Sequence, residues 1–188
     1  MKKGNSGLLI LMSFLFVIAI GLAFVQSQQE KMNDVYAGTV VPKGGGRPVS
    51  VKLYAQGVTS DTEAHALAST LKSGGQDALV KAMEKMDNGR FAPPIGVGTR
   101  VAVVRIRKTE KGQRITMVTD RPITFPELWN STRSTDYPFG IVQLDLDDKG
   151  SGEGTIIVAA KIKFTSDDTI EVESYSLGPH KIMSVRKL

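Results

Sequence analysis

The feature that most limits how this chain can fold is a period-two alternation of apolar and polar residues after residue 35. It is clearest near the C-terminus, where five apolar side chains occupy every second position: Ile156, Val158, Ala160, Ile162 and Phe164. Successive side chains of a β-strand point to opposite faces of the sheet, so this pattern predicts half-buried strands. We expect these five side chains to share one face.

Turn residues divide the alternating segments into hairpins. Val35–Val41 and the strand that starts at Val49 flank a turn with three glycines between two prolines. A three-residue turn at 166–168 places Lys163 opposite Glu171 and Lys161 opposite Glu173, and each facing pair contributes about 0.2–1 kcal/mol. The remaining expected strands are Val101–Lys108, Arg114–Arg121, Phe139–Asp147, Thr155–Thr165, Thr169–Tyr175 and Lys181–Lys187.

The pattern changes to a helical one between residues 61 and 89. Asp61 is the expected N-cap of a first helix, and Gly74-Gly75 ends it. A second helix follows and stops at Asn88-Gly89. These signals predict a large, mostly antiparallel sheet, built as a meander of hairpins, with a helical hairpin packed on one side, which is an α+β fold.

The N-terminus is built like a leader. Lys2 and Lys3 precede an uncharged apolar stretch, Leu8–Val25. This layout is typical of a secretory signal, and the stretch also has the minimum length for a membrane-spanning helix. We therefore expect a signal peptide or membrane anchor at 1–27, a tether at 28–34 and a single domain at 35–188. Either alternative places that domain outside the cytoplasm, secreted, periplasmic or held on the inner membrane by residues 8–25.

The amino-acid composition excludes or disfavours several kinds of function. The chain has no Cys, which excludes thiol catalysis and Cys-ligated zinc. Without Lys2 and Lys3, 22 Lys/Arg stand against 19 Asp/Glu, too small an excess to predict nucleic-acid binding. The segment Gly98–Arg121 is locally basic, which favours a solvated sheet face or a contact with anionic lipid or polysaccharide.

No motif predicts a metal or a cofactor. Asp145–Gly150 begins like a calcium loop, but Lys149 occupies the fifth position and Ile156 the twelfth, where calcium needs oxygen ligands. We expect an acidic hairpin turn there. His65 and His180 lack metal-ligand spacing, and we expect both to be non-catalytic.

One stretch is dense in groups able to bind a ligand. Residues 119–139, here called the aromatic crossover, include the strings TDRPITFPELW and DYPF. Aromatic faces flanked by charges are able to stack a sugar or peptide ring, and the candidate binding residues are Asp120, Arg121, Trp129, Arg133, Asp136 and Tyr137. The alternative is a satellite core with Arg121 paired to Asp136. Thr124 and Glu127 form a capping box that predicts a short helix near Phe125–Ser131.

Three strings, VTDRPITF, STDYPF and GEGTIIVAAKI, resemble a family of exported bacterial single-domain proteins with no known activity. The resemblance covers residues 49–188. It implies a bacterial, exported, single-domain protein and carries over no catalytic residue.

The leading functional prediction is an exported, non-enzymatic envelope protein that binds a polysaccharide, peptide or protein partner. Its expected contact surface is the aromatic crossover beside the basic Gly98–Arg121 segment. One alternative is a hydrolase of envelope carbohydrate that uses two of Asp120, Glu127 and Asp136 as acid and base. Another is a purely structural module. Membrane contact is expected through the N-terminal segment if it is retained.

Overall fold

A computed structural model describes residues 31–124, 136–165, 169–175 and 178–188. The elements of this part, in chain order, are β1 (Lys31–Val41), β2 (Val49–Gly57), α2 (Asp61–Met83), β3 (Gly89–Ala92), β4 (Thr99–Val101), β5 (Val103–Thr109), β6 (Gly112–Thr119), β7 (Phe139–Asp147), β8 (Ser151–Phe164), β9 (Ile170–Ser174) and β10 (His180–Lys187).

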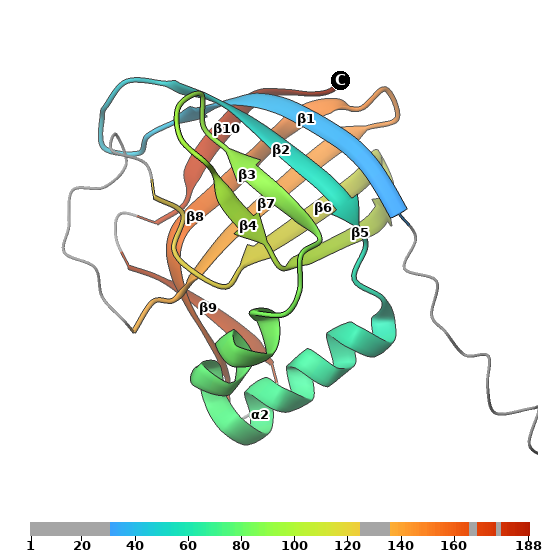
Figure 1. Cartoon of the computed structure of the whole chain (residues 1–188). Coiled ribbons are helices and arrows are strands. Elements are labelled where there is room, and N and C mark those ends of the chain that lie inside the picture. The colour runs from blue at the N-terminus through green and yellow to red at the C-terminus, as the bar shows by residue number, and fades with distance from the viewer. Residues whose placement is uncertain (1–30, 125–135, 166–168, 176–177) are drawn as a thin grey trace, which may run out of the picture.

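The strands form one antiparallel sheet that curls into a nearly closed, barrel-like shape (Figure 1). Its strand order is β4-β3-β2-β1-β10-β8-β7-β6-β5, with β9 added beside β8. The two ends of this order are consecutive in the chain, because only Ala102 separates β4 from β5. The Ala102 N–H donates to Val118 O at 2.9 Å, and the Asn88 N–H donates to Val101 O at 2.9 Å. The bend at Ala102 therefore closes the sheet.

Curling separates the buried side chains into two cores. The inner core fills the barrel and includes Tyr36, Leu53, Phe91, Leu144 and Ile182. The outer core lies between α2 and the outside of the sheet, and its fully or largely buried members are Leu71, Leu79, Met83, Ala102, Val103, Phe139, Ala160 and Ile162. Each strand that passes under the helix is therefore covered on both faces.

The prediction that residues 156–164 present one apolar face is wrong. Phe139 pairs with Ala160, whereas Ile141 pairs with Ile157, so β8 carries one extra residue at this point. An extra residue of this kind is a β-bulge, and it reverses which face the following side chains occupy. Ile156 consequently lies in the inner core, while Ala160 and Ile162 lie in the outer core.

The helical region also differs from the prediction. The N-cap of α2 is Ser60 rather than Asp61: Ser60 Oγ accepts from the Glu63 N–H at 3.2 Å, and Glu63 Oε2 accepts from the Ser60 N–H at 2.8 Å. The expected α+β fold with a helical hairpin is wrong: in the described residues, a nearly closed antiparallel sheet carries one helical segment, α2. Only Gly75, with φ 70°, leaves the helical conformation within Asp61–Met83. One such residue kinks a helix, whereas a helical hairpin needs a connection of about 2–5 residues.

The expected hairpins are otherwise confirmed. β1 pairs with β2 and β5 with β6, and β9 pairs with β8 so that Lys163 faces Glu171 and Lys161 faces Glu173. Lys163 Nζ lies 3.3 Å from Glu171 Oε2. The sheet is not a simple meander, because β10 inserts between β1 and β8.

The expected N-terminal helix and the short helix near Phe125–Ser131 fall outside the described residues. Within the described residues, no helix combines the length and the apolar character needed to cross a membrane.

Candidate functional site

Asp120 lies beneath two arginines and forms an ion pair with each of them. Its carboxylate is almost fully buried, with 2% of the side chain exposed, and contacts the guanidinium groups of Arg100 and Arg121. Burial by itself would raise the pKa of Asp120, but the hydrogen bonds and charges of Arg121 and Arg100 outweigh burial and lower it. A carboxylate held ionised in this way is unsuited to act as a general acid.

Tyr137 and Asp136 lie in a different environment. Tyr137 donates a hydrogen bond to Glu173, and its ring meets that of Tyr175 edge to face with 5.1 Å between centroids. The bond to Glu173 raises the pKa of Tyr137. The Asp136 carbonyl accepts from Gln76 of α2 at 3.0 Å. Tyr137 is thus tied to β9, whereas Asp120 is tied to β4 through Arg100. Trp129, Arg133 and Glu127 lie outside the described residues.

Four arginines of the basic Gly98–Arg121 segment form ion pairs with carboxylates. Arg105 contacts Asp61 at the start of α2, and Arg114 Nε lies 2.5 Å from Asp145 Oδ1 across β6 and β7. Arg100 and Arg121 contact Asp120. Because these four arginines are paired with carboxylates, the segment is best explained as a solvated face of the sheet.

A groove on the outside of β10, β1, β2 and the end of β3 has a different charge arrangement. We call it the basic groove; its volume is about 530 Å³, and it is lined by Ala37, Gly38, Thr39, Ser50, Val51, Lys52, Tyr54, Ala92, Pro93, Pro94, Ser184 and Arg186. Ala37 of β1 is in register with Arg186 of β10 on one side and with Lys52 of β2 on the other. Adjacent strands are about 4.8 Å apart, so the Cα atoms of Lys52 and Arg186 lie roughly 10 Å from one another, on either side of Ala37.

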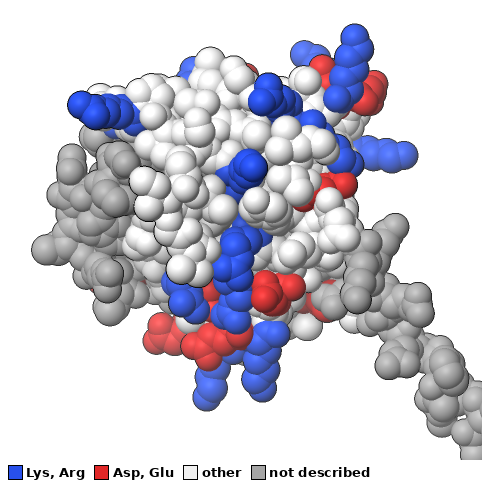
Figure 2. Space-filling model, turned by 45° about the horizontal axis from the view of Figure 1, so that its top comes forward, with Lys and Arg blue, Asp and Glu red and all other residues white. Residues whose placement is uncertain are grey.

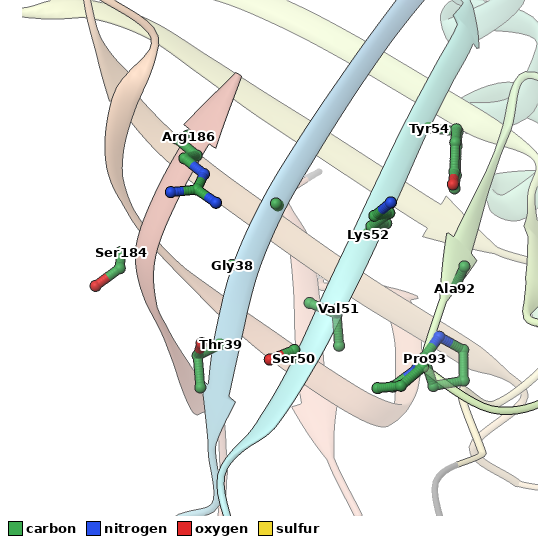
Figure 3. Close-up of a pocket in the computed structure, with 12 residues that line it drawn as sticks. Gly38, Thr39, Ser50, Val51, Lys52, Tyr54, Ala92, Pro93, Ser184 and Arg186 are labelled. Carbon is green, nitrogen blue, oxygen red and sulfur yellow. The ribbon is translucent and has the colours of Figure 1, made fainter. Parts of the chain in front are cut away.

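The side chains around this pair suit a polar ligand. Figure 3 shows the Arg186 guanidinium extending towards β1, with Lys52 on the far side of β1. Thr39 and Ser50 form the next row of the sheet and present hydroxyl groups beside the cations. Tyr54 and Pro93 form the wall away from β10 (Figure 3).

The backbone of β10 is irregular where it borders the groove. Its register shifts between Ile182 and Val185 in the pairing with β8 and between Met183 and Arg186 in the pairing with β1, and Ser184 adopts a left-handed φ of 52°. Its side chain turns away from β1 (Figure 3). Such bulges commonly re-aim neighbouring side chains beside functional sites.

Acidic residues are missing from the sequence around the groove. Residues 35–60, 88–109 and 174–188 contain no Asp or Glu, yet they carry three, five and three Lys/Arg. Within the described part of the chain, neither Lys52 nor Arg186 makes an ion pair, and Glu153 on β8 makes none with either. Figure 2 brings the top of Figure 1 forward, and several blue side chains lie in the middle of the face that it shows, with red side chains beside them towards the lower edge.

His180 fastens the turn at one end of the groove. Its Nδ1 accepts a hydrogen bond from the Lys43 N–H at 2.9 Å, which joins the β1–β2 turn to the start of β10. Burial lowers the pKa of His180, and the charge of Lys43 lowers it further. An accepting Nδ1 requires the neutral ring. In its neutral form, His180 therefore holds the β1–β2 turn against the start of β10.

This arrangement predicts a pH-dependent loss of stability. The unfolded chain binds a proton at His180 near pH 6.5, the ordinary value, whereas the folded chain does so only at lower pH. The free energy of unfolding should be unaffected by His180 above that pH and should fall as pH drops below it. Asn at position 180 keeps an acceptor but does not titrate. Urea unfolding at pH 7 and pH 5 should therefore show a smaller loss for His180→Asn than for the unaltered protein, and equal losses would contradict the assignment.

The predicted acidic turn is present between β7 and β8. Asp147 Oδ1 accepts from the backbone N–H groups of Lys149 and Ser151, each at 2.9 Å. The carboxylate is thus used to close the turn. Over the described ranges, no group of three or more His, Asp or Glu side chains is arranged to hold a metal ion.

The groove residues were not singled out from the sequence. Each is ordinary for its strand, and they come from four separate strands. The signal that would have found them is the absence of Asp and Glu from three segments that also carry the strand pattern. No protein-family model matches the chain, and neither does any curated protein or solved structure.

Proposed function

We propose that this protein is an extracytoplasmic binding module that holds an anionic group in the basic groove. The observation that carries the proposal is the row Arg186–Ala37–Lys52, in which two cations without ion-pair partners in the described chain flank a small residue. Guanidinium and ammonium groups beside hydroxyls match the oxygens of a phosphate or carboxylate. The leader-like N-terminus supports a location outside the cytoplasm.

Binding rather than catalysis is favoured by how the ionisable groups are used. Asp120 is held ionised beneath two arginines, and the His180 ring is occupied by the Lys43 N–H. Among the described residues, the polar side chains that line the groove are two cations and four hydroxyl groups, with no carboxylate or imidazole. Its residues are therefore suited to retain an anion, whereas general acid–base chemistry calls for a group that titrates near neutral pH.

Charge reversal in the groove should abolish binding of a compact polyanion. With tripolyphosphate as the probe, isothermal titration calorimetry at an ionic strength of about 0.15 M should show an affinity at least about 10-fold weaker for the double variant Lys52→Glu/Arg186→Glu. Hydrogen bonds to charged groups contribute about 1.5–3 kcal/mol each, which makes this a lower limit. Both side chains are exposed, so the midpoint of thermal unfolding should change little.

A variant with the same change in net charge serves as the control. Lys111 and Lys149 lie in the β5–β6 and β7–β8 turns and do not line the groove. Lys111→Glu/Lys149→Glu should bind tripolyphosphate about as well as the unaltered protein, since distant charges are screened. Equal weakening by both double variants would show that net charge, and not the groove, attracts the anion.

A further inference from the structure

The hairpin between β3 and β4 ends in an exposed apolar tip, residues 93–98. Ile95 is 90% exposed and Val97 is 84% exposed, the highest values among the large apolar side chains of the described chain. Two prolines precede them, and Gly96 adopts a left-handed φ of 108°. Arg90 Nη1 donates to Val97 O at 3.0 Å. The tip thus has a defined shape that holds two aliphatic side chains in water.

Further exposed apolar side chains lie at the same end of the sheet. Lys52 pairs with Ala92, so the chain beyond Ala92 runs alongside the start of β2 towards the β1–β2 turn (Figure 1). Val41 ends β1 beside this turn, and Met183 pairs with Thr39 in the neighbouring row. This end of the sheet therefore carries four of the seven exposed large apolar side chains of the described chain: Val41, Ile95, Val97 and Met183.

Cations surround this apolar end. Lys43 and Arg47 belong to the β1–β2 turn, and Lys181 pairs with Val41 at the start of β10. Together with Lys52 and Arg186 they make no ion pair with an acid in the described residues. The sequence segments that build this end contain no Asp or Glu.

We propose that this end of the sheet docks on an anionic lipid bilayer, with Ile95 and Val97 entering the interface and the surrounding cations binding lipid headgroups. The inference rests on the proposed function, because it names the membrane headgroup as the source of the anion held in the groove. A bilayer surface presents anionic headgroups directly above hydrocarbon, which matches aliphatic side chains ringed by cations. Nucleic acid and anionic polysaccharide offer the charge without the hydrocarbon, and the tip carries no aromatic ring to stack on a base.

Two weak signals act together in such a surface. A small apolar tip alone gives only marginal membrane binding, and so does a small group of cations; their combination gives stable attachment. Binding should consequently require anionic lipid and should weaken with salt.

The absence of Cys from the chain allows a site-specific test in the full-length protein. Val97→Cys provides the only thiol, and an NBD fluorophore attached there reports whether the tip leaves water. With vesicles of phosphatidylcholine and phosphatidylglycerol, NBD emission at position 97 should rise severalfold and shift to shorter wavelength. Vesicles of phosphatidylcholine alone should give a much smaller change.

A label on another strand controls for attachment through the N-terminal segment. Val172 lies on β9 and is also exposed, so Val172→Cys labelled with NBD should show no change with either vesicle. Adding Ile95→Asp to the Val97→Cys protein should remove the response while leaving thermal unfolding unchanged. Equal responses at positions 97 and 172, or none at 97, would overturn the docking proposal.

Tripolyphosphate binding separates this proposal from the one on which it rests. If calorimetry shows the groove-dependent affinity and NBD at position 97 does not respond, the groove binds a soluble anion and membrane docking is wrong. Binding of heparin or single-stranded DNA without an NBD response to anionic vesicles would likewise overturn docking. If neither tripolyphosphate nor vesicles bind, both proposals fail.

Discussion

Asn88→Asp is expected to lower the free energy of unfolding by about 3 kcal/mol or more at pH 7. The buried Asn88 amide donates to Ala102 O at 2.8 Å and to Thr59 Oγ1 at 3.1 Å. Ala102 is the residue at which the chain bends from β4 into β5 to close the sheet. A carboxylate of the same shape would place an acceptor against the Ala102 carbonyl and bury a charge. Urea unfolding of the variant measures the loss.

Two comparisons make this prediction specific. Asn88→Ala removes the donor without adding a charge and should cost less, about 2 kcal/mol. The new carboxyl of Asn88→Asp should have a raised pKa in the folded state, so the deficit of that variant should shrink as pH falls and the group becomes a donor. Asn88→Ala should show no such recovery. An aspartate variant as stable as the unaltered protein at pH 7 would contradict the role assigned to the amide.

Gly152→Ala is expected to cost about 3 kcal/mol or more, although it adds only one methyl group. A Cβ at this position would lie 1.9 Å from the carbonyl oxygen of Asp145 and 3.0 Å from Leu146 Cα on β7. Both obstacles are backbone atoms, so relief requires β7 and β8 to move apart. Differential scanning calorimetry should show a transition lower by many degrees.

The adjacent residue provides the matched control. Ser151 is exposed, and its backbone N–H, not its side chain, contacts Asp147. Ser151→Ala should therefore change the free energy of unfolding by less than about 0.5 kcal/mol. Comparable losses at the two positions would mean that the region is sensitive to any change and that the close approach at Gly152 is not the cause.

Predictions from the sequence succeeded where the determining interactions are local. Lys163 and Glu171 face one another in the β8–β9 pairing, as the strand period and the short separation of the two strands in the sequence predict. The β1–β2 hairpin follows from alternation on both sides of a glycine-rich turn. The N-cap of α2, Ser60, lies one residue before the expected Asp61, because the capping interactions form within the first turn of the helix.

The prediction of a helical hairpin was wrong because the Gly74-Gly75 pair does not by itself determine how the helix continues. Gly74-Gly75 is compatible with a break, a kink or an uninterrupted helix, and the choice depends on which apolar side chains find a partner surface. Leu71 before the kink and Leu79 and Met83 after it all pack on the same outer core. One kinked segment buries all three.

The proposed binding site, the basic groove, was hard to predict for a related reason. The sequence predicts a contact surface at the aromatic crossover, where groups able to bind a ligand are close together along the chain. The basic groove instead gathers Arg186, Ala37 and Lys52, which are far apart in sequence and meet only through the pairing of β10 with β1 and β1 with β2. The apolar–polar period of a single strand does not determine the order of the strands in the sheet. The sequence pattern therefore could not show that these three residues form a row.

The sequence by itself determined that this chain is built from hairpins with alternating faces, because side-chain period and turn chemistry act over a few residues. Only the tertiary structure decided that the sheet curls nearly closed, that β8 changes face at its bulge, and that two cations from distant strands flank one alanine. These outcomes depend on contacts between backbones that are remote in sequence. The one extra residue in β8 changes its register with β7, and Gly152 lies so close to the β7 backbone that a Cβ would clash there.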